Sequence, residues 1–225
     1  MRAGCLRWYP LRARGLEEEK RRVREDVWRT LEERGVALPP LPCRGRIPNF
    51  KGADVAALRL RGLKEYVEAE LVLVNPDSPQ LHVRRMALLD GKRVIMATPR
   101  LRHGFLLLDP ARLGGAIDEA STISGAFKHG IRQAQLPSVD LVVEGSVAVD
   151  PAGRRLGKGG GYGDLEIRMA REVSPGVKVA TTVHSLQVLP SVPAWEGDER
   201  VDYIATEQGL FEVGAGLRRL NSPGR

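Results

Sequence analysis

Short apolar segments rich in β-branched residues alternate with helical segments along this chain, and this alternation is the strongest constraint on its fold. The strand candidates are residues 69–74, 93–97, 139–149, 177–183 and 201–206, of which 139–149 is long enough for one strand or two. Helical or irregular stretches such as 79–89 and 165–173 separate them. This order favours a mostly parallel sheet with helices on both faces. We therefore predict an α/β fold whose ligands bind beyond the carboxyl ends of the strands.

A glycine-rich octet joins one predicted strand to the helix that follows it. It reads Gly157-Lys158-Gly159-Gly160-Gly161-Tyr162-Gly163-Asp164. Glycine permits positive φ and brings backbone N–H groups close to a ligand, and the first helical turn adds free donors at the positive end of the dipole. The octet is therefore a candidate phosphate-binding loop. The alternative is a tight turn from strand to helix that binds nothing.

The octet matches neither of the two best-known phosphate-binding motifs. A P-loop requires Ser or Thr after its lysine, but Gly159 follows Lys158. The dinucleotide-binding motif requires a last glycine where Tyr162 or Asp164 stands, depending on the frame. The rest of the sequence must therefore indicate what the loop binds.

The charge of the chain is concentrated near its start. The formal net charge is +7 over 225 residues, and the first fifty residues hold 12 Lys and Arg against 7 Asp and Glu. A basic start beside an anion loop suggests a polyanionic ligand, such as a nucleotide, a polyglutamylated cofactor or a nucleic acid. A solvated basic surface is the simpler explanation of the charge alone.

Other functional classes lack their characteristic residues. No apolar stretch approaches the ~20 residues needed to span a bilayer, and the Arg-rich start lacks the apolar core of a secretory signal. We therefore expect a cytoplasmic protein. Cys5 and Cys43 form no CxxC pair, and the four histidines have no metal-ligand spacing. Ser146 and Ser185 lack the Gly-x-Ser-x-Gly setting of a hydrolase nucleophile.

Two pairs of charged residues are further candidates for a site. Lys20 and Arg24 are four residues apart on a helix predicted over 17–35, so they share a face and either point at an anion or pair with neighbouring Glu. Asp198 and Asp202 flank the segment that leads into the last predicted strand. They are candidate Mg²⁺ ligands, or else solvated loop acids.

The loops that follow the predicted strands are where a site is expected. They are residues 75–77, residues 98–100, the octet, residues 184–185 with the candidate His184, and the chain from Glu207 onward. A short helix is predicted over 53–63. Segment 110–137 has no clear period and is predicted to be a surface excursion, although its Ser121, Thr122, Ser124, Lys128 and His129 could line a site.

Several segments, taken in order, resemble the 5-formyltetrahydrofolate cyclo-ligase family. They are Lys20-x-x-x-Arg24, residues 153–164 (GRRLGKGGGYGD) and residues 198–207 (DERVDYIATE). The chain is most similar to the divergent branch of methenyltetrahydrofolate synthetase domain-containing proteins. That similarity lies in residues 46–53 (RIPNFKGA), 98–101 (TPRL), 145–149 (GSVAV) and 163–166 (GDLE).

The resemblance implies a three-layer α/β/α sandwich and a ring closure that depends on ATP and Mg²⁺. In that reaction ATP phosphorylates the formyl oxygen of 5-formyltetrahydrofolate, N10 attacks the activated carbon, and 5,10-methenyltetrahydrofolate forms with release of ADP and phosphate. The residues implied to bind ATP are Lys20, Arg24, Arg155, Gly157, Lys158, Gly159, Gly160, Gly161, Tyr162 and Asp164. Tyr162, against the folate, and Lys158 are the implied catalytic residues, and Asp202 with Asp198 would serve the metal.

The chain departs from the family pattern at two places. Gly163 stands where a second tyrosine is usual, and no acidic residue for the pterin is found around Ala56-Ala57. One alternative is a diverged nucleotide-binding protein with another substrate. Another is a non-catalytic nucleic-acid-binding module that uses the basic arm. Along the chain we expect a flexible basic arm over 1–16, one cyclo-ligase-like domain over 17–217 and a tail over 218–225.

Overall fold

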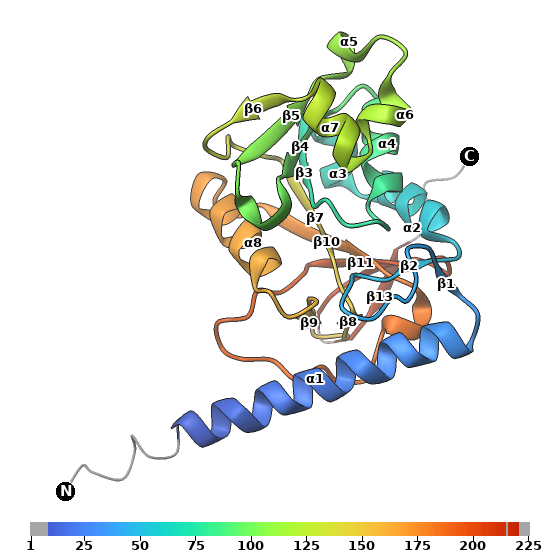
Figure 1. The fold of residues 1–225 in the computed structure, drawn as a ribbon, viewed down its shortest axis with the longest axis vertical. Coiled ribbons are helices and arrows are strands. Elements are labelled where there is room, and N and C mark those ends of the chain that lie inside the picture. The colour runs from blue at the N-terminus through green and yellow to red at the C-terminus, as the bar shows by residue number, and fades with distance from the viewer. Residues whose placement is uncertain (1–8, 215, 221–225) are drawn as a thin grey trace, which may run out of the picture.

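The computed structural model describes residues 9–214 and 216–220, and it is built around a sheet of nine strands (Figure 1). Their order is β13-β12-β11-β10-β7-β3-β4-β5-β6. In chain order they are β3 (Leu71–Val74), β4 (Arg93–Ala97), β5 (Phe105–Leu108), β6 (Ile131–Gln133), β7 (Leu141–Gly145), β10 (Lys178–Thr182), β11 (Tyr203–Ala205), β12 (Leu210–Glu212) and β13 (Arg218–Leu220).

The five central strands of this sheet, from β11 to β4, run parallel. Two antiparallel strands extend the sheet at each edge. They are β12 and β13 on one side and β5 and β6 on the other. The predicted α/β fold with a mostly parallel central sheet is confirmed. Of the two alternatives for residues 139–149, the structure has two strands, β7 and β8 (Ala148–Val149), and β8 pairs with β9 (Arg155–Leu156) in a separate hairpin.

Helices cover both faces of the sheet. One face carries α2 (Ala53–Arg59), α3 (Lys64–Glu68), α4 (Leu81–Leu89), α6 (Ile117–Ala120) and α7 (Ile123–His129), and the other carries α8 (Tyr162–Val173). Successive strand residues point to opposite faces, so Val72 and Val74 join the first apolar cluster while Leu71 and Leu73 join the second. Burial of apolar area on both faces is what holds these layers together.

The remaining elements are short connections. They are β1 (Ala37–Leu38), β2 (Asn49–Phe50), α5 (Pro110–Leu113) and the 3₁₀ turns η1 (Leu60–Gly62), η2 (Pro99–Leu101) and η3 (Ser185–Gln187). No helix among the described residues combines the length and the apolarity that crossing a bilayer demands.

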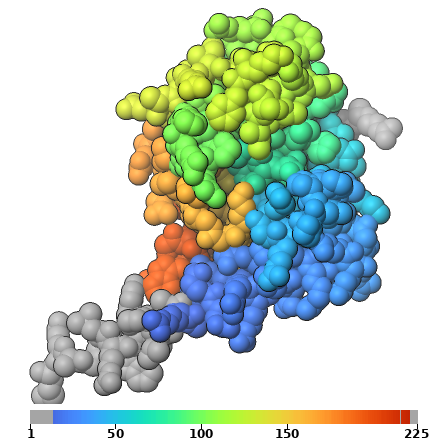
Figure 2. Space-filling view, in the orientation of Figure 1, coloured from blue at the N-terminus to red at the C-terminus, as the bar shows by residue number. Residues whose placement is uncertain are grey.

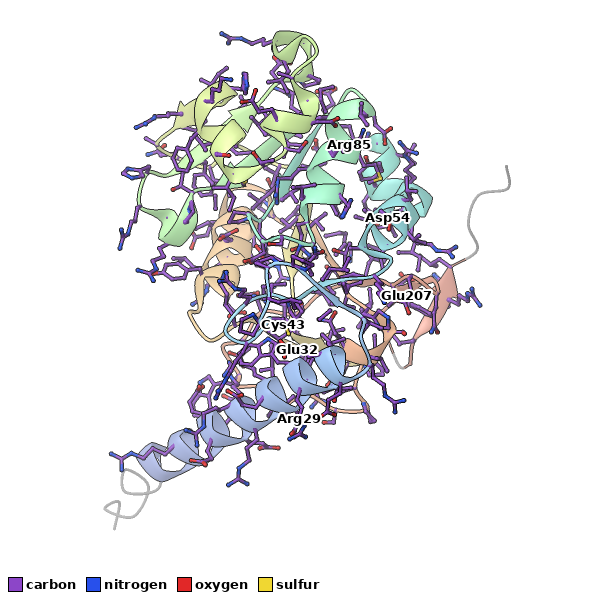
Figure 3. The ribbon with its side chains drawn as sticks, turned by 45° about the vertical axis from the view of Figure 1, so that its right-hand side comes forward. Arg29, Glu32, Cys43, Asp54, Arg85 and Glu207 are labelled. Atoms are coloured by element: carbon purple, nitrogen blue, oxygen red, sulfur yellow. The ribbon has the colours of Figure 1, made fainter. Side chains whose placement is uncertain are left out.

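The long helix α1 (Tyr9–Glu33) lies along one end of the molecule (Figure 1). Its Trp28 and Leu31 are buried in a third apolar cluster with residues of the segment 43–47 and of the β8–β9 hairpin. Polar contacts reinforce the packing, since Trp28 Nε1 donates to the Arg46 carbonyl at 2.9 Å. Glu32 accepts from the Cys43 backbone N–H at 2.7 Å, and Figure 3 shows these two residues close together. Helix α1 thereby fixes the segment 43–47.

Three expectations about the ends and the middle of the chain need correction. Helix α1 begins at Tyr9 rather than Glu17, so part of the expected basic arm is helical, and the arm's residues 1–8 lie outside the described residues. Residues 218–220, expected in a tail, form β13. Segment 110–137 is no mere surface excursion, because it supplies three short helices and the edge strand β6.

The stability of the α1 contact can be tested with one large-to-small substitution. Leu31 is fully buried at 0% exposure. We expect Leu31→Ala to lower the free energy of unfolding by about 2–5 kcal/mol, because it removes apolar contacts and leaves a cavity. Leu58→Ala is the matched control, since Leu58 is 49% exposed. Urea denaturation followed by circular dichroism measures both, and equal losses in the two variants would contradict the contact.

Candidate functional site

A cavity of about 510 Å³ opens where β3, β4 and β7 end. Its walls come from four loops that are far apart in the sequence, namely residues 45–47, 75–78, 98–100 and 157–164. In Figure 2 the blue segment near residue 45, the green segment near 100 and the gold segment near 160 meet on one face of the molecule. The strand-end loops 75–77 and 98–100 and the glycine octet therefore lie where the sequence predicts a site.

The other strand-end loops that were expected at the site do not line this cavity. His184 caps the turn η3, where its Nδ1 accepts from the Leu186 N–H at 3.1 Å and its backbone N–H donates to Gln187 Oε1 at 2.8 Å. Its ring also packs edge-on against Phe50. Glu207 accepts from the Ser185 N–H at 2.9 Å. These contacts give His184 a structural role.

The glycine octet leads from β9 into α8 and wraps one wall of the cavity. Gly159 and Gly161 have φ of 104° and 72°, which side chains rarely adopt, and Gly161 is the residue before α8 begins. Tyr162, the first residue of α8, lines the cavity and is partly exposed. The helix thus starts at the cavity, with the N–H groups of its first turn at that end.

Gly163 is required by the close approach of two side chains. A Cβ at this position would lie 2.4 Å from Arg155 Nη2 and 3.0 Å from Glu144 Oε2. A larger residue would therefore displace the arginine. The glycine that departs from the family pattern thus leaves the space that this guanidinium occupies.

Two basic side chains of the octet region lie at the cavity, and each contacts an acid. Lys158 Nζ lies 2.6 Å from Asp77 Oδ1. Arg155 is almost fully buried, and its guanidinium donates to the Gly145 carbonyl at 3.2 Å and to Asp164 Oδ1 at 3.3 Å. The Nε of Arg155 is buried without a hydrogen-bond partner. Both cations therefore line the cavity, and their contact with ATP stays a prediction.

The other predicted cations hold α1 against nearby loops. Lys20 Nζ contacts Asp198 Oδ2 at 2.5 Å, and Asp198 also accepts from the Trp195 N–H at 2.6 Å. Arg24 Nε donates to the Gly157 carbonyl at 2.8 Å. Neither Lys20 nor Arg24 lines the cavity. Their expected contact with ATP phosphates stays a prediction.

The expected metal pair is not assembled. Asp202 precedes β11, at the amino ends of the parallel strands, where it accepts from Lys178 Nζ at 3.0 Å and from the Val179 N–H at 2.9 Å. The cavity lies at the opposite, carboxyl ends. Within residues 9–214 and 216–220 no three His, Cys, Asp or Glu gather as metal ligands would. The residues present do not fit a Mg²⁺ site formed by Asp198 and Asp202.

Two buried acids at the cavity, Glu144 of β7 and Glu166 of α8, are absent from the predicted site. Burial raises the pKa of both carboxyls. The negative charge of Glu144 raises the pKa of Glu166 further, while Arg155 opposes the rise for Glu144. Asn75 Nδ2 donates to Glu144 Oε2 at 3.0 Å. The available signal is that Glu144 interrupts an otherwise apolar strand.

Arg84 of α4 positions the loop that carries Asn75 and Asp77. It is 1% exposed, and burial lowers the pKa of its guanidinium to about 10. Its Nη1 donates to the Asn75 carbonyl at 2.5 Å and its Nε to the Ser121 carbonyl at 2.7 Å. These bonds use backbone acceptors, so the carboxylate of Asp77 stays available to Lys158 and Asn75.

Comparison with known proteins places the chain among folate-related proteins. Residues 16–207 match the model of the 5-formyltetrahydrofolate cyclo-ligase family. The methenyltetrahydrofolate synthase domain-containing protein of Mus musculus is 38% identical over 207 residues, covering 87% of this chain and 55% of that protein. The Homo sapiens protein of the same name is 36% identical over 213 residues, covering 89% and 55%. The chain thus spans about half the length of these curated relatives.

A solved structure agrees at the level of the fold. The NMR structure of Aquifex aeolicus 5,10-methenyltetrahydrofolate synthetase superimposes with a TM-score of 0.50 at 22% identity, covering 92% of this chain and 94% of that one. These similarities lend no support to the nucleic-acid-binding alternative. The match over residues 16–207 and the identity to the curated relatives show that the chain belongs to the 5-formyltetrahydrofolate cyclo-ligase family.

Proposed function

We propose that this protein is an ATP-dependent cyclo-ligase that converts 5-formyltetrahydrofolate to 5,10-methenyltetrahydrofolate with release of ADP and phosphate. The observation that carries the proposal is the position of the glycine octet. It places the N-terminus of helix α8 at a cavity that Arg155 and Lys158 also line. Membership of the cyclo-ligase family supports the same reaction.

The phosphate half of the proposed site rests on donors that point at one end of the cavity. The first-turn N–H groups of α8 have no intrahelical acceptors and favour an anion. Lys158 is half exposed, and within the described residues Asp77 is its one ion-pair partner, so a phosphate can replace that carboxylate. The unpartnered Nε of Arg155 is a further donor. ATP phosphates therefore fit the octet.

The remaining space suits a second, ring-shaped substrate. A volume of about 510 Å³ falls within the range of roughly 300–1,000 Å³ that small-molecule sites usually have. Tyr162 presents an aromatic ring to this space, and Ile47 and Ile123 contribute aliphatic side chains. A flat heterocycle such as the pterin of a reduced folate can pack against such a wall.

The proposed reaction asks the protein mainly to stabilise a moving phosphoryl group. Cations and backbone N–H groups supply that stabilisation when they are fixed before the reaction begins. Arg155 is held in this way by the Gly145 carbonyl and Asp164. Mg²⁺ enters as the counter-ion of ATP, while Asp198 and Asp202 pair with Lys20 and Lys178 and take no part in the proposed phosphoryl transfer.

A direct assay tests the proposed reaction. Purified protein mixed with 5-formyltetrahydrofolate, ATP and Mg²⁺ is expected to form the methenyl product, which is followed by its absorbance. Omission of ATP is the control and is expected to abolish the signal. If ATP binds but no methenyl product forms at high enzyme concentration, the protein acts on another substrate.

The role of Lys158 in phosphate binding is tested by substitution. We expect Lys158→Ala to weaken ATP binding about tenfold, because a charge-assisted hydrogen bond contributes roughly 1.5–3 kcal/mol. Isothermal titration calorimetry measures the affinity. Lys64→Ala is the matched control, since Lys64 is exposed on α3 and pairs only with Glu68. An unchanged affinity of the Lys158 variant would rule out the proposed contact.

A further inference from the structure

Buried acceptor oxygens without donors gather around the end of β7. These four oxygens, none of which has a hydrogen-bond partner, are Asn75 Oδ1, Gln80 Oε1, Glu144 Oε1 and Glu166 Oε2. None of these residues is more than 5% exposed. A buried acceptor that lacks a donor is costly, so such groups in a native protein call for a partner. The missing partner must supply donors.

Three of these four residues line the cavity, so a ligand can reach them. Asn75, Glu144 and Glu166 form part of its wall. The amide nitrogens are already used, because Asn75 Nδ2 donates to Asp77 and Glu144, and Gln80 Nε2 donates to Thr182 Oγ1. The unpaired atoms of Asn75, Glu144 and Glu166 are therefore acceptors, and they match N–H groups of a ligand, while the unpaired Nε of Arg155 is a donor on the phosphate side.

The charges at the wall point to the same class of ligand. Asp77 has Lys158 as its basic partner and Asp164 has Arg155, whereas no basic group of the described residues lies within ion-pair distance of Glu144 or Glu166. The two buried carboxyls are close enough for the negative charge of Glu144 to raise the pKa of Glu166. The pair repels phosphate and attracts a group of positive or partly positive character.

The geometry points to a subsite in which Glu144 and Glu166 together bind an N–H-bearing nitrogen group of the second substrate, such as the amino edge of a 2-amino-4-oxopyrimidine ring. This inference rests on the proposed function, because it states which part of the substrate faces the pair. Glu166 lies one turn into α8, whose first residue Tyr162 closes the glycine loop. The nitrogen subsite therefore adjoins the phosphate site.

Binding of two probes to the full chain tests the subsite. The probes are 5-formyltetrahydrofolate and the fragment 2-aminopyrimidin-4-one, titrated by calorimetry and by ligand-observed NMR, respectively. We expect Glu166→Gln and Glu144→Gln each to weaken both probes about tenfold or more, since the amide replaces one acceptor oxygen with an NH₂ donor that cannot accept from the ligand. ATP affinity should stay unchanged. Glu172→Gln is the matched control, because Glu172 is an exposed residue of the same helix.

Each result of these titrations either supports or overturns the inference. Equal affinities in the wild type and both variants would overturn it, as would a fragment that fails to bind the wild type at millimolar concentration. If the fragment binds in a Glu166-dependent manner and 5-formyltetrahydrofolate does not bind, the subsite stands and the proposed substrate is wrong. Mg²⁺ alone is titrated as well. Mg²⁺ binding lost in the variants with unaltered fragment binding would make the pair a metal site and overturn the inference.

The pH dependence of thermal unfolding separates a binding defect from a folding defect. The charged groups that line the cavity with the pair are Arg46, Asp77, Arg100, Arg155, Lys158 and Asp164. Since the pKa of Glu166 is raised in the folded chain, the native state keeps a proton that the unfolded state releases, and stability falls as pH rises. Above the ordinary glutamate pKa of about 4.3 the melting temperature of the wild type should fall more steeply with pH than that of Glu166→Gln. Parallel curves would contradict the raised pKa of Glu166.

Discussion

The central strand β7 is the element on which the rest of this structure depends. It pairs in parallel with β3 on one side and β10 on the other, and its five residues are all buried. Parallel neighbours end at the same edge, so the topology alone brings the loops after β3, β4 and β7 together there. The cavity, its acids and its glycine loop all follow from this one arrangement. Everything beyond it concerns which side chains the loops bring.

Those side chains are arranged as opposed charges rather than as a purely basic cradle. Lys158 and Arg155 each lie beside a carboxylate, and Arg84 holds the loop that carries one of these acids. An entering phosphate must therefore displace Asp77 from Lys158 to gain its full interaction. This exchange lowers the affinity for simple anions and favours a ligand that also satisfies the freed acidic side. A site of this kind discriminates between whole substrates and isolated phosphate groups.

The layout of the fold is predictable from the sequence, while its edges and its acid pair are not. The apolar run of β4 matches its predicted bounds, because a buried parallel strand has to be apolar on both faces. Strand β5 is missed since its Phe-Leu-Leu-Leu run is too short for periodicity to separate strand from helix. Segment 110–137 packs through small residues such as Ala120 and Ala126, which leave no apolar period. Asp198 and Asp202 are close in sequence, but each side chain contacts a different part of the chain. Pairing across α8 and β7 brings Glu144 to Glu166, and no local pattern encodes that contact.

The close contact around Gly163 links two positions that lie eight residues apart. A side chain at 163 would meet the inward guanidinium of Arg155, so the end of that arginine would have to move. Its present bonds to the Gly145 carbonyl and to Asp164 depend on the space that glycine leaves free. The size of residue 163 thus controls where the positive charge of Arg155 lies in the cavity.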